Sequence, residues 1–168
     1  VYVLRINEKL SPDAQVNYDI LKKITGVNVV DLNMGDKIPA THPDDIILDA
    51  IFGSGLNRPV EGYAATAIRF INALPNTKIA VDIPSGLFGE DNTANIPENI
   101  VRAHFTVTLQ FPPLSFFFAD NEQYTGRWTI LPIGLHPDAI KQKETPFEYV
   151  QHSDITGLLK KRRAFSHK

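Results

Sequence analysis

The 168-residue sequence contains no cysteine, one methionine and one tryptophan. Without cysteine the chain can form neither a disulfide framework nor a thiolate metal site, which fits a reducing compartment such as the cytoplasm. It has no large excess of charge of one sign, with 17 Lys and Arg against 19 Asp and Glu, and no apolar run as long as a membrane span. We therefore expect neither a nucleic-acid partner nor a membrane partner.

The residues that are present indicate a globular α/β domain, since 43% are hydrophobic and 21% charged. Apolar runs of strand length alternate with segments of helical periodicity, which is typical of a doubly wound fold with a mostly parallel sheet covered on both faces. The strands are predicted at Val1–Ile6, Val27–Leu32, Asp45–Phe52, Lys78–Ile83, His104–Phe111 and Arg127–Ile133.

Helix signals and loop signals separate these strands. One helix is predicted from an N-cap at Ser11 to a C-cap at Gly26, and another over Glu61–Leu74, which Pro75 stops. The run at 46–48 is continuously apolar, which predicts a strand buried on both faces. Residues 89–97 are predicted as a loop and 153–162 as a helix or linker. Because no clear helix lies between Phe111 and Gly134, an antiparallel edge strand is predicted there.

Two of the predicted strands carry an acid near their carboxyl ends, and glycines follow. Asp49 precedes Gly53-Ser54-Gly55, and Asp82 precedes Pro84-Ser85-Gly86. An Asp within an apolar strand is costly unless it is paired, protonated or bound to a metal. Ligands bind at the carboxyl ends of strands in open α/β sheets, so the two segments together predict one site, and the glycine loop offers amides to a phosphate.

Simpler interpretations exist for each feature alone. A single strand-end Asp is often a turn residue, and Gly-Ser-Gly without a following Lys does not match the P-loop pattern. Ser85 has no base nearby in sequence, so a serine hydrolase is disfavoured. The aromatic run Phe116-Phe117-Phe118 is interpreted as core or as an oligomer contact. The histidines have no metal-ligand spacing, which disfavours a zinc site: His42, His104, His136, His152 and His167.

The two acidic segments resemble the signature segments of the NAD(P)HX epimerase family, the YjeF-type N-terminal domain. They read DAIFGSGLNRP from Asp49 to Pro59 and VDIPSGL from Val81 to Leu87, and Ala103–Thr108 resembles the next family strand, Ala-Asp-x-Thr-Val-Thr. The resemblance spans Val1 to Leu135 and implies a Rossmann-like three-layer αβα sandwich. It also implies that a first strand and a phosphate loop with an Asn-Asn-Gly-Gly-Asp segment precede Val1.

The resemblance implies a role for each matched residue. Asp49 and Ser85 would bind a potassium ion as cofactor, and Asp82 would contact the substrate and act as the acid/base. The loop that would bind the substrate consists of Gly53, Ser54, Gly55, Leu56, Asn57, Arg58 and Pro59. One departure is the stretch Gln110–Leu114, with Pro113, where the family commonly carries a Lys.

A second resemblance concerns the tail. Residues 162–168 resemble the beginning of the ADP- or ATP-dependent NAD(P)H-hydrate dehydratase domain, which has a ribokinase-like fold. We therefore expect residues 1–150 to be the C-terminal part of an epimerase domain and 151–168 to be a linker into a dehydratase domain. The chain is then expected to be a fragment of a bifunctional enzyme and inactive alone.

The implied function is that of an isomerase, which interconverts the S and R forms of NADH or NADPH hydrated at ring carbon 6. The parent chain would also be a lyase. Its partner would be this small-molecule substrate, and a homo-oligomer in the cytoplasm is expected. One alternative is a non-catalytic YjeF-type nucleotide-binding, protein or RNA scaffold module, and another is a generic nucleotide-binding domain. The residues do not distinguish NADH from NADPH.

Overall fold

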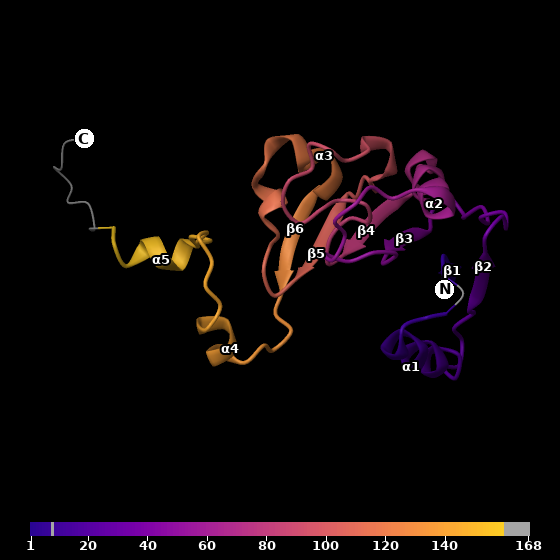
Figure 1. Ribbon diagram of the computed structural model, residues 1–168, viewed down its shortest axis with the longest axis horizontal. Coiled ribbons are helices and arrows are strands. Elements are labelled where there is room, and N and C mark those ends of the chain that lie inside the picture. Colours follow the sequence, from indigo (N-terminus) through magenta and orange to yellow (C-terminus); the bar gives the residue numbers. More distant parts are fainter. Residues whose placement is uncertain (8, 160–168) are drawn as a thin grey trace. The chain divides into compact units, whose positions relative to one another are not determined.

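The structure is a computed structural model that describes residues 1–7 and 9–159 (Figure 1). Contacts divide the chain into two compact units, Val1–Ile133 and Gly134–Lys168. The predicted domain boundary at 150 stays a prediction, and the tail residues 162–168 that resemble a dehydratase domain lie outside the described residues. The part of the chain that the structure describes contains no helix long and apolar enough to span a membrane.

All strand pairs that the described residues form are parallel, which confirms the predicted α/β class. Two strands form one sheet in the order β1-β2, and four form a second in the order β3-β4-β5-β6. The strands are β1 (Tyr2–Arg5), β2 (Val30–Asn33), β3 (Ile46–Asp49), β4 (Thr77–Val81), β5 (Phe105–Leu109) and β6 (Arg127–Leu131).

The helices connect these strands. In the first unit they are α1 (Pro12–Leu21), α2 (Gly62–Ala73), η1 (Pro97–Asn99), η2 (Leu114–Phe117), η3 (Ala119–Asn121) and α3 (Glu122–Thr125). In the second unit they are α4 (Pro137–Lys141) and α5 (His152–Thr156). The α2 helix agrees with the prediction, and α5 agrees in part with the helix predicted from 153. Residues 89–96 carry no helix or strand, as expected for the predicted loop.

The α1 helix begins as predicted and ends earlier. The Ser11 hydroxyl accepts a hydrogen bond from the Ala14 amide at 3.3 Å, which caps the first turn. The C-cap is Lys22, so the prediction of a cap at Gly26 was wrong. The reason is that bonds between residues three apart, such as Ile24 N to Leu21 O at 3.1 Å, tighten the chain into turns before the glycine is reached.

Two further predictions about strands were wrong. β6 pairs with β5 in parallel, from Phe105 opposite Arg127 to Leu109 opposite Leu131, because the short helices between them carry the chain back across the sheet. The run at 46–48 is not buried on both faces, since Ile46 and Leu48 are 62% and 67% exposed. β3 is the edge strand of its sheet, and the face that carries Ile46 and Leu48 is largely open.

Two clusters of buried side chains hold the first unit together. One joins α2 to the chain around β3 and contains Val60, Ala64, Ala65, Ile68 and Val101. The other lies beneath the segments that follow β4 and contains Ile83, Leu87, Ile100, Phe116 and Tyr124. Of the predicted aromatic run, Phe116 is therefore core, while Phe117 and Phe118 are about half exposed. The clusters fix the two chain segments that leave β3 and β4.

Candidate functional site

The carboxyl ends of β3 and β4 are adjacent, as predicted. Asp49 is the last residue of β3 and pairs in register with Ala80 of β4. Asp82 and Ser85 follow β4 directly, and hydrogen bonds join each of them to the β3 side of the site. The structure thus brings Asp49, Gly53, Asp82 and Ser85 together at one edge of the sheet, which confirms their predicted clustering.

Asp49 and Ser85 form a buried pair, with residual exposures of 1% and 0%. The Ser85 hydroxyl donates to Asp49 Oδ1 at 2.6 Å, and the Ser85 amide donates to Asp49 Oδ2 at 2.8 Å. The Ile51 amide gives Oδ1 a further, longer bond of 3.3 Å. Burial raises the pKa of Asp49, while these bonds from Ser85 and Ile51 act in the opposite direction. The cost of burying this carboxyl group is offset by three donors.

The same pair presents oxygen atoms of the kind that a hard cation prefers. Ser85 Oγ lies 2.6 Å from Asp49 Oδ1 and 3.4 Å from the Phe52 carbonyl oxygen, so a carboxylate, a hydroxyl and a carbonyl converge. Oxygen ligands with a single carboxylate suit a weakly charged hard cation. Among the described residues there is no group of three or more His, Asp or Glu that could hold a metal ion. The donor set here is one carboxylate, one hydroxyl and one carbonyl oxygen, and both oxygens of the carboxylate already accept hydrogen bonds.

Ser85 is unsuited to act as a nucleophile in this arrangement. Its hydroxyl has a carboxylate within 2.6 Å, which the sequence could not indicate, but the residue is fully buried. The Phe52 amide also donates to Ser85 Oγ at 2.9 Å. With both bonds made inside the protein, the hydroxyl links the segments after β3 and β4 and does not face a substrate.

Asp82 lies outside the strand in which it was predicted, because β4 ends at Val81. Its backbone has a φ of 71°, a conformation that few residues other than glycine adopt and that Asp and Asn tolerate best. The Asp82 amide donates to the Val107 carbonyl at 2.8 Å, which anchors the turn to β5. The side chain is half-buried. A backbone outlier of this kind, at a strand end beside a glycine loop, is a common feature of functional sites.

The glycine loop fixes one oxygen of Asp82 and leaves the other free. The Ser54 amide donates to Asp82 Oδ2 at 3.0 Å, and a Cβ atom on Gly53 would lie 3.1 Å from the same oxygen. A side chain at position 53 would push against this oxygen, so glycine allows the loop its close approach. In the part of the chain that the structure describes, no donor reaches Asp82 Oδ1, so this oxygen can exchange a proton with a bound molecule.

The rest of the loop offers unpaired amide groups. Gly55, Asn57 and Arg58 are exposed, and Leu56 is half-buried. Within residues 1–7 and 9–159, no acceptor takes a hydrogen bond from the amides of residues 55–58. A run of such amides is suited to bind the oxygens of a phosphate. The predicted substrate loop thus lies next to the acid, although the side chains of Asn57 and Arg58 contact neither Asp82 nor Asp49.

The stretch from Gln110 to Leu114 follows β5, and its bonds lead away from the two carboxylates. Gln110 has a φ of 63°, and its side-chain oxygen accepts a hydrogen bond from the Ile133 amide at 3.0 Å. This residue is therefore occupied in closing the end of β5 against the chain after β6. No side chain of this stretch forms a hydrogen bond with Asp82 or Asp49.

Several supporting residues were not singled out from the sequence. The Asn95 side chain donates to the Gly86 carbonyl at 2.8 Å, and Asn92 bonds to the Phe88 backbone through both its side-chain atoms. Asn99 donates to the Val60 carbonyl at 2.7 Å, which ties η1 to the chain after the loop. The only sequence signal was the abundance of Asn in the segment predicted as a loop.

Comparison with known sequences adds the family. The sequence profile described as "YjeF-related protein N-terminus" matches residues 1–115, which is most of the chain and includes Asp49, the glycine loop, Asp82 and Ser85. The chain belongs to this family. The resemblance inferred from the two acidic segments is thereby confirmed.

Curated proteins that contain the YjeF-related domain are similar to most of this chain. An "NAD(P)H-hydrate epimerase" from Oenococcus oeni is 34% identical over 136 residues, which cover 81% of this chain and 61% of that protein. A "Bifunctional NAD(P)H-hydrate repair enzyme Nnr" from Pyrobaculum aerophilum is 30% identical over 83% of this chain and 28% of that protein. Another from Moorella thermoacetica is 28% identical over 100% of this chain and 32% of that protein. The chain spans less than two thirds of the length of each.

Proposed function

We propose that the protein interconverts the S and R forms of hydrated NADH or NADPH, the substrate that the names of its relatives carry. The observation that supports this most strongly is the position of Asp82. Its Oδ2 is held by the Ser54 amide at 3.0 Å, and its Oδ1 is left without a donor among the described residues, beside a loop of unpaired amides. A carboxylate placed next to a phosphate-binding loop is suited to act on a nucleotide.

The proposed chemistry needs one mobile proton. Inversion of ring carbon 6 requires that its bond to the hydroxyl oxygen or to the ring nitrogen break and form again on the other face. If the bond to nitrogen breaks, Asp82 takes the hydroxyl proton as the carbonyl forms and gives a proton to the nitrogen that receives the electron pair. If the bond to oxygen breaks, protonated Asp82 gives its proton to the hydroxyl group, which leaves as water while the lone pair of the ring nitrogen forms an iminium with carbon 6. The reverse of the first route closes the ring, and the reverse of the second restores the hydroxyl; in both cases carbon 6 is inverted when the bond forms on the other face.

In this proposal the remaining site residues bind and orient the substrate. Residues 53–59 would hold the phosphate-bearing part of the nucleotide through backbone amides. Asp49 and Ser85 would hold a potassium ion, which when bound would supply a buried positive charge beside the segments that follow β3 and β4. In the full-length protein we propose coupling to ADP- or ATP-dependent dehydration, as the bifunctional relatives' names suggest.

Replacement of Asp82 tests the proposal in the full-length protein with potassium present. In Asp82→Asn the amide keeps the shape, tolerates the positive φ and can still accept the Ser54 amide, but it cannot exchange the proton. We expect the interconversion of the two epimers, followed by chromatography, to slow by about 100-fold or more. Glu90→Gln is the matched control, because it removes an exposed carboxylate from the next loop and should leave the rate unchanged.

Two outcomes would contradict the proposal in different ways. A normal rate in Asp82→Asn would show that Asp82 is not the acid/base. A wild-type protein that binds nucleotide without converting either epimer would instead fit a scaffold module.

The cytoplasm is the proposed setting. A homo-oligomer is also proposed, with support from Phe118, which is 47% exposed; sedimentation of the wild type and of Phe118→Ser tests this.

A further inference from the structure

A cavity lies at the carboxyl ends of β1 and β2. Its volume is about 480 Å³, and it is lined by Arg5, Ile6, Asn7, Asp31, Asn33 and Met34. Arg5 and Asn33 are the last registered pair of the parallel ladder, so the cavity opens at the end of the strands where α/β sheets bind ligands. None of its residues belongs to the site around Asp82.

The Arg5 side chain is held in a fixed orientation. Its Nε donates to Asp31 Oδ1 at 2.7 Å, and its guanidinium lies 4.6 Å from the centre of the Tyr18 ring. The Tyr18 hydroxyl donates to Asp31 Oδ2 at 2.6 Å, so both oxygens of Asp31 already accept hydrogen bonds. The bond to Asp31 uses Nε and leaves the two terminal amino groups of Arg5 outside this pair. An oriented guanidinium of this kind can bind a phosphate through two parallel bonds.

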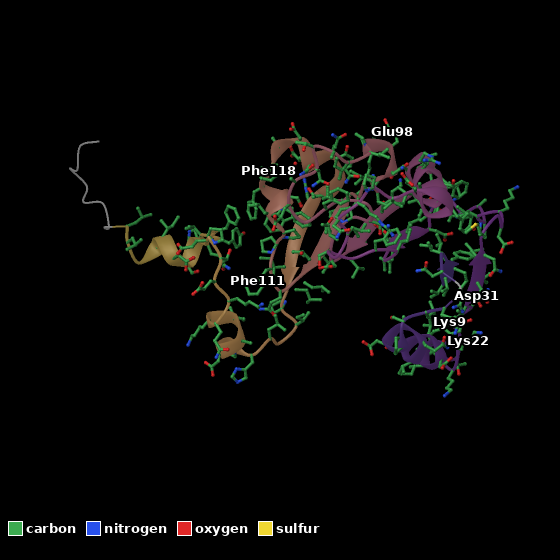
Figure 2. All side chains as sticks on the ribbon, in the orientation of Figure 1. Lys9, Lys22, Asp31, Glu98, Phe111 and Phe118 are labelled. Carbon is green, nitrogen blue, oxygen red and sulfur yellow. The ribbon has the colours of Figure 1, made fainter. Side chains whose placement is uncertain are left out.

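Two basic side chains lie close to this cavity, Arg5 in its lining and Lys22 on the Tyr18 ring. The Lys22 ammonium lies 4.4 Å from the centre of the Tyr18 ring, on the ring that Arg5 also contacts. Figure 2 labels Lys22, the C-cap of α1, and Asp31 of β2. The carboxylates nearby are Asp31, which is bonded to Arg5, and Asp36, whose Oδ2 accepts a hydrogen bond from the Asn33 amide at 2.7 Å. Because Asp31 is already saturated by Arg5 and Tyr18, it is poorly placed to accept a hydroxyl group of a ribose.

Packing connects this cavity to the phosphate loop. Ile6, which lines the cavity, packs against the buried cluster of Val60, Ala64 and Ile68, and Leu56 of the loop packs against the same cluster. The Tyr63 hydroxyl also donates to the Asp36 carbonyl at 3.0 Å, which links α2 to the chain after β2. A dinucleotide with its diphosphate on the loop could therefore extend its other end into the cavity.

We propose that this cavity binds the 2′-phosphate on the adenosine ribose of hydrated NADPH, with Arg5 as the residue that recognises it. This inference rests on the proposed function and specifies its substrate: the phosphorylated cofactor is preferred. Arg5 would contact the phosphate through its terminal amino groups, and Asp31 would act as a positioning residue. Asn7 and Asn33 also line the cavity, and the Asn33 side chain donates a hydrogen bond to Asp36 Oδ2 at 3.3 Å.

Adenosine nucleotides without a nicotinamide ring test the cavity independently of epimerisation. Binding of 2′,5′-ADP, 3′,5′-ADP and 5′-AMP to the full-length protein is measured by calorimetry in phosphate-free buffer. We expect 2′,5′-ADP to bind about 10-fold or more tightly than 5′-AMP, as a pair of charge-assisted bonds allows. The preference should fall to about 1-fold in Arg5→Met and be only partly kept in Arg5→Lys, which retains the charge without the planar fork.

The controls separate this inference from the proposed function. Lys23→Met removes an exposed charge next to the end of α1 without touching the cavity, so it should retain the preference. Asp82→Asn should lose epimerisation and retain the preference, whereas Arg5→Met should raise the KM for hydrated NADPH more than for hydrated NADH. Equal wild-type binding of 2′,5′-ADP and 5′-AMP, or equal binding of 2′,5′-ADP and 3′,5′-ADP, overturns the assignment. A full preference in Arg5→Met also overturns it.

Discussion

The hydroxyl of Ser85 is predicted to be the group on which the architecture of the site depends most. Ser85→Ala removes one oxygen atom and two hydrogen bonds, the 2.6 Å bond to Asp49 Oδ1 and the 2.9 Å bond from the Phe52 amide. Asp49 is 1% exposed, so water cannot replace the lost donor. A buried acceptor that loses one of three donors costs about 1 to 3 kcal/mol, and the lost bond of the Phe52 amide adds about 1 kcal/mol. We expect the free energy of unfolding to fall by about 2 to 4 kcal/mol.

Denaturant titration of the wild type and the variant measures this loss. Ser54→Ala is the matched control, because the Ser54 hydroxyl forms no hydrogen bond with a described residue and its amide bond to Asp82 is kept. The control should change the unfolding free energy by less than about 0.5 kcal/mol. The reasoning that a buried Asp49–Ser85 pair supports the site would be refuted if both variants lost similar amounts of unfolding free energy. It would also be refuted if Ser85→Ala lost less than about 0.5 kcal/mol.

The same titrations test the proposed cation. A ligand that binds only the folded state stabilises it by an amount that grows with its concentration. Potassium chloride should therefore raise the unfolding free energy of the wild type more than an equal concentration of choline chloride. Asp49→Asn removes the carboxylate and should lose this difference. Equal effects of the two salts on the wild type would contradict a potassium site at Asp49 and Ser85.

Three other predictions follow from single positions. In Gly53→Ala the new methyl group would lie 3.1 Å from Asp82 Oδ2, so kcat should fall about 10-fold while unfolding free energy changes by less than about 1 kcal/mol. In Gly86→Ala the residue has a φ of 98° and its Cβ would overlap the Asn99 carbonyl oxygen, so stability should fall by about 2 kcal/mol or more, measured by the same titration. Hydrogen bonds from Tyr18 and then Arg5 lower the pKa of Asp31 in the folded protein. The stability that this carboxylate contributes is therefore complete above its unfolded pKa of about 4. It is lost as the pH falls through the lower folded pKa. Asp31→Asn should remove that part of the acid sensitivity, and an unchanged pH dependence would contradict it.

The sequence predicted the elements whose signals are local. The α2 helix was predicted because its apolar spacing and Pro75 are both encoded within the segment, and Ser11 indicated the start of α1 for the same reason. The direction of β6 was not local information, because it depends on how the short helices after β5 return the chain. The exposure of Ile46 and Leu48 depends on which strands flank β3. An apolar run in the sequence does not distinguish an edge strand from a central one.

The candidate site shows the same division. Strand-end acids followed by glycines were sufficient to predict that Asp49, Asp82 and Ser85 lie together, because parallel strands place their carboxyl ends at one edge. The positive φ of Asp82 and its anchor on Val107 were not predictable, since they depend on a residue of β5 far away in the chain. Arg5 was overlooked for a similar reason: its partner Asp31 is 26 residues away and is brought to it by the β1–β2 register.

The contacts of the site form a continuous chain from the buried acid to the half-buried one. Asp49 holds the hydroxyl of Ser85, and this hydroxyl holds the Phe52 amide. Two residues further on, the Ser54 amide holds Asp82 Oδ2. Only Gly53 separates Phe52 from Ser54, and glycine restricts its backbone little. The bond from the Phe52 amide to Ser85 is therefore needed to hold the Ser54 amide in place, and the Ser54 amide in turn positions the Asp82 carboxylate. The charge state and ligands of Asp49 can therefore influence the orientation of Asp82, although no hydrogen bond joins the two carboxyl groups.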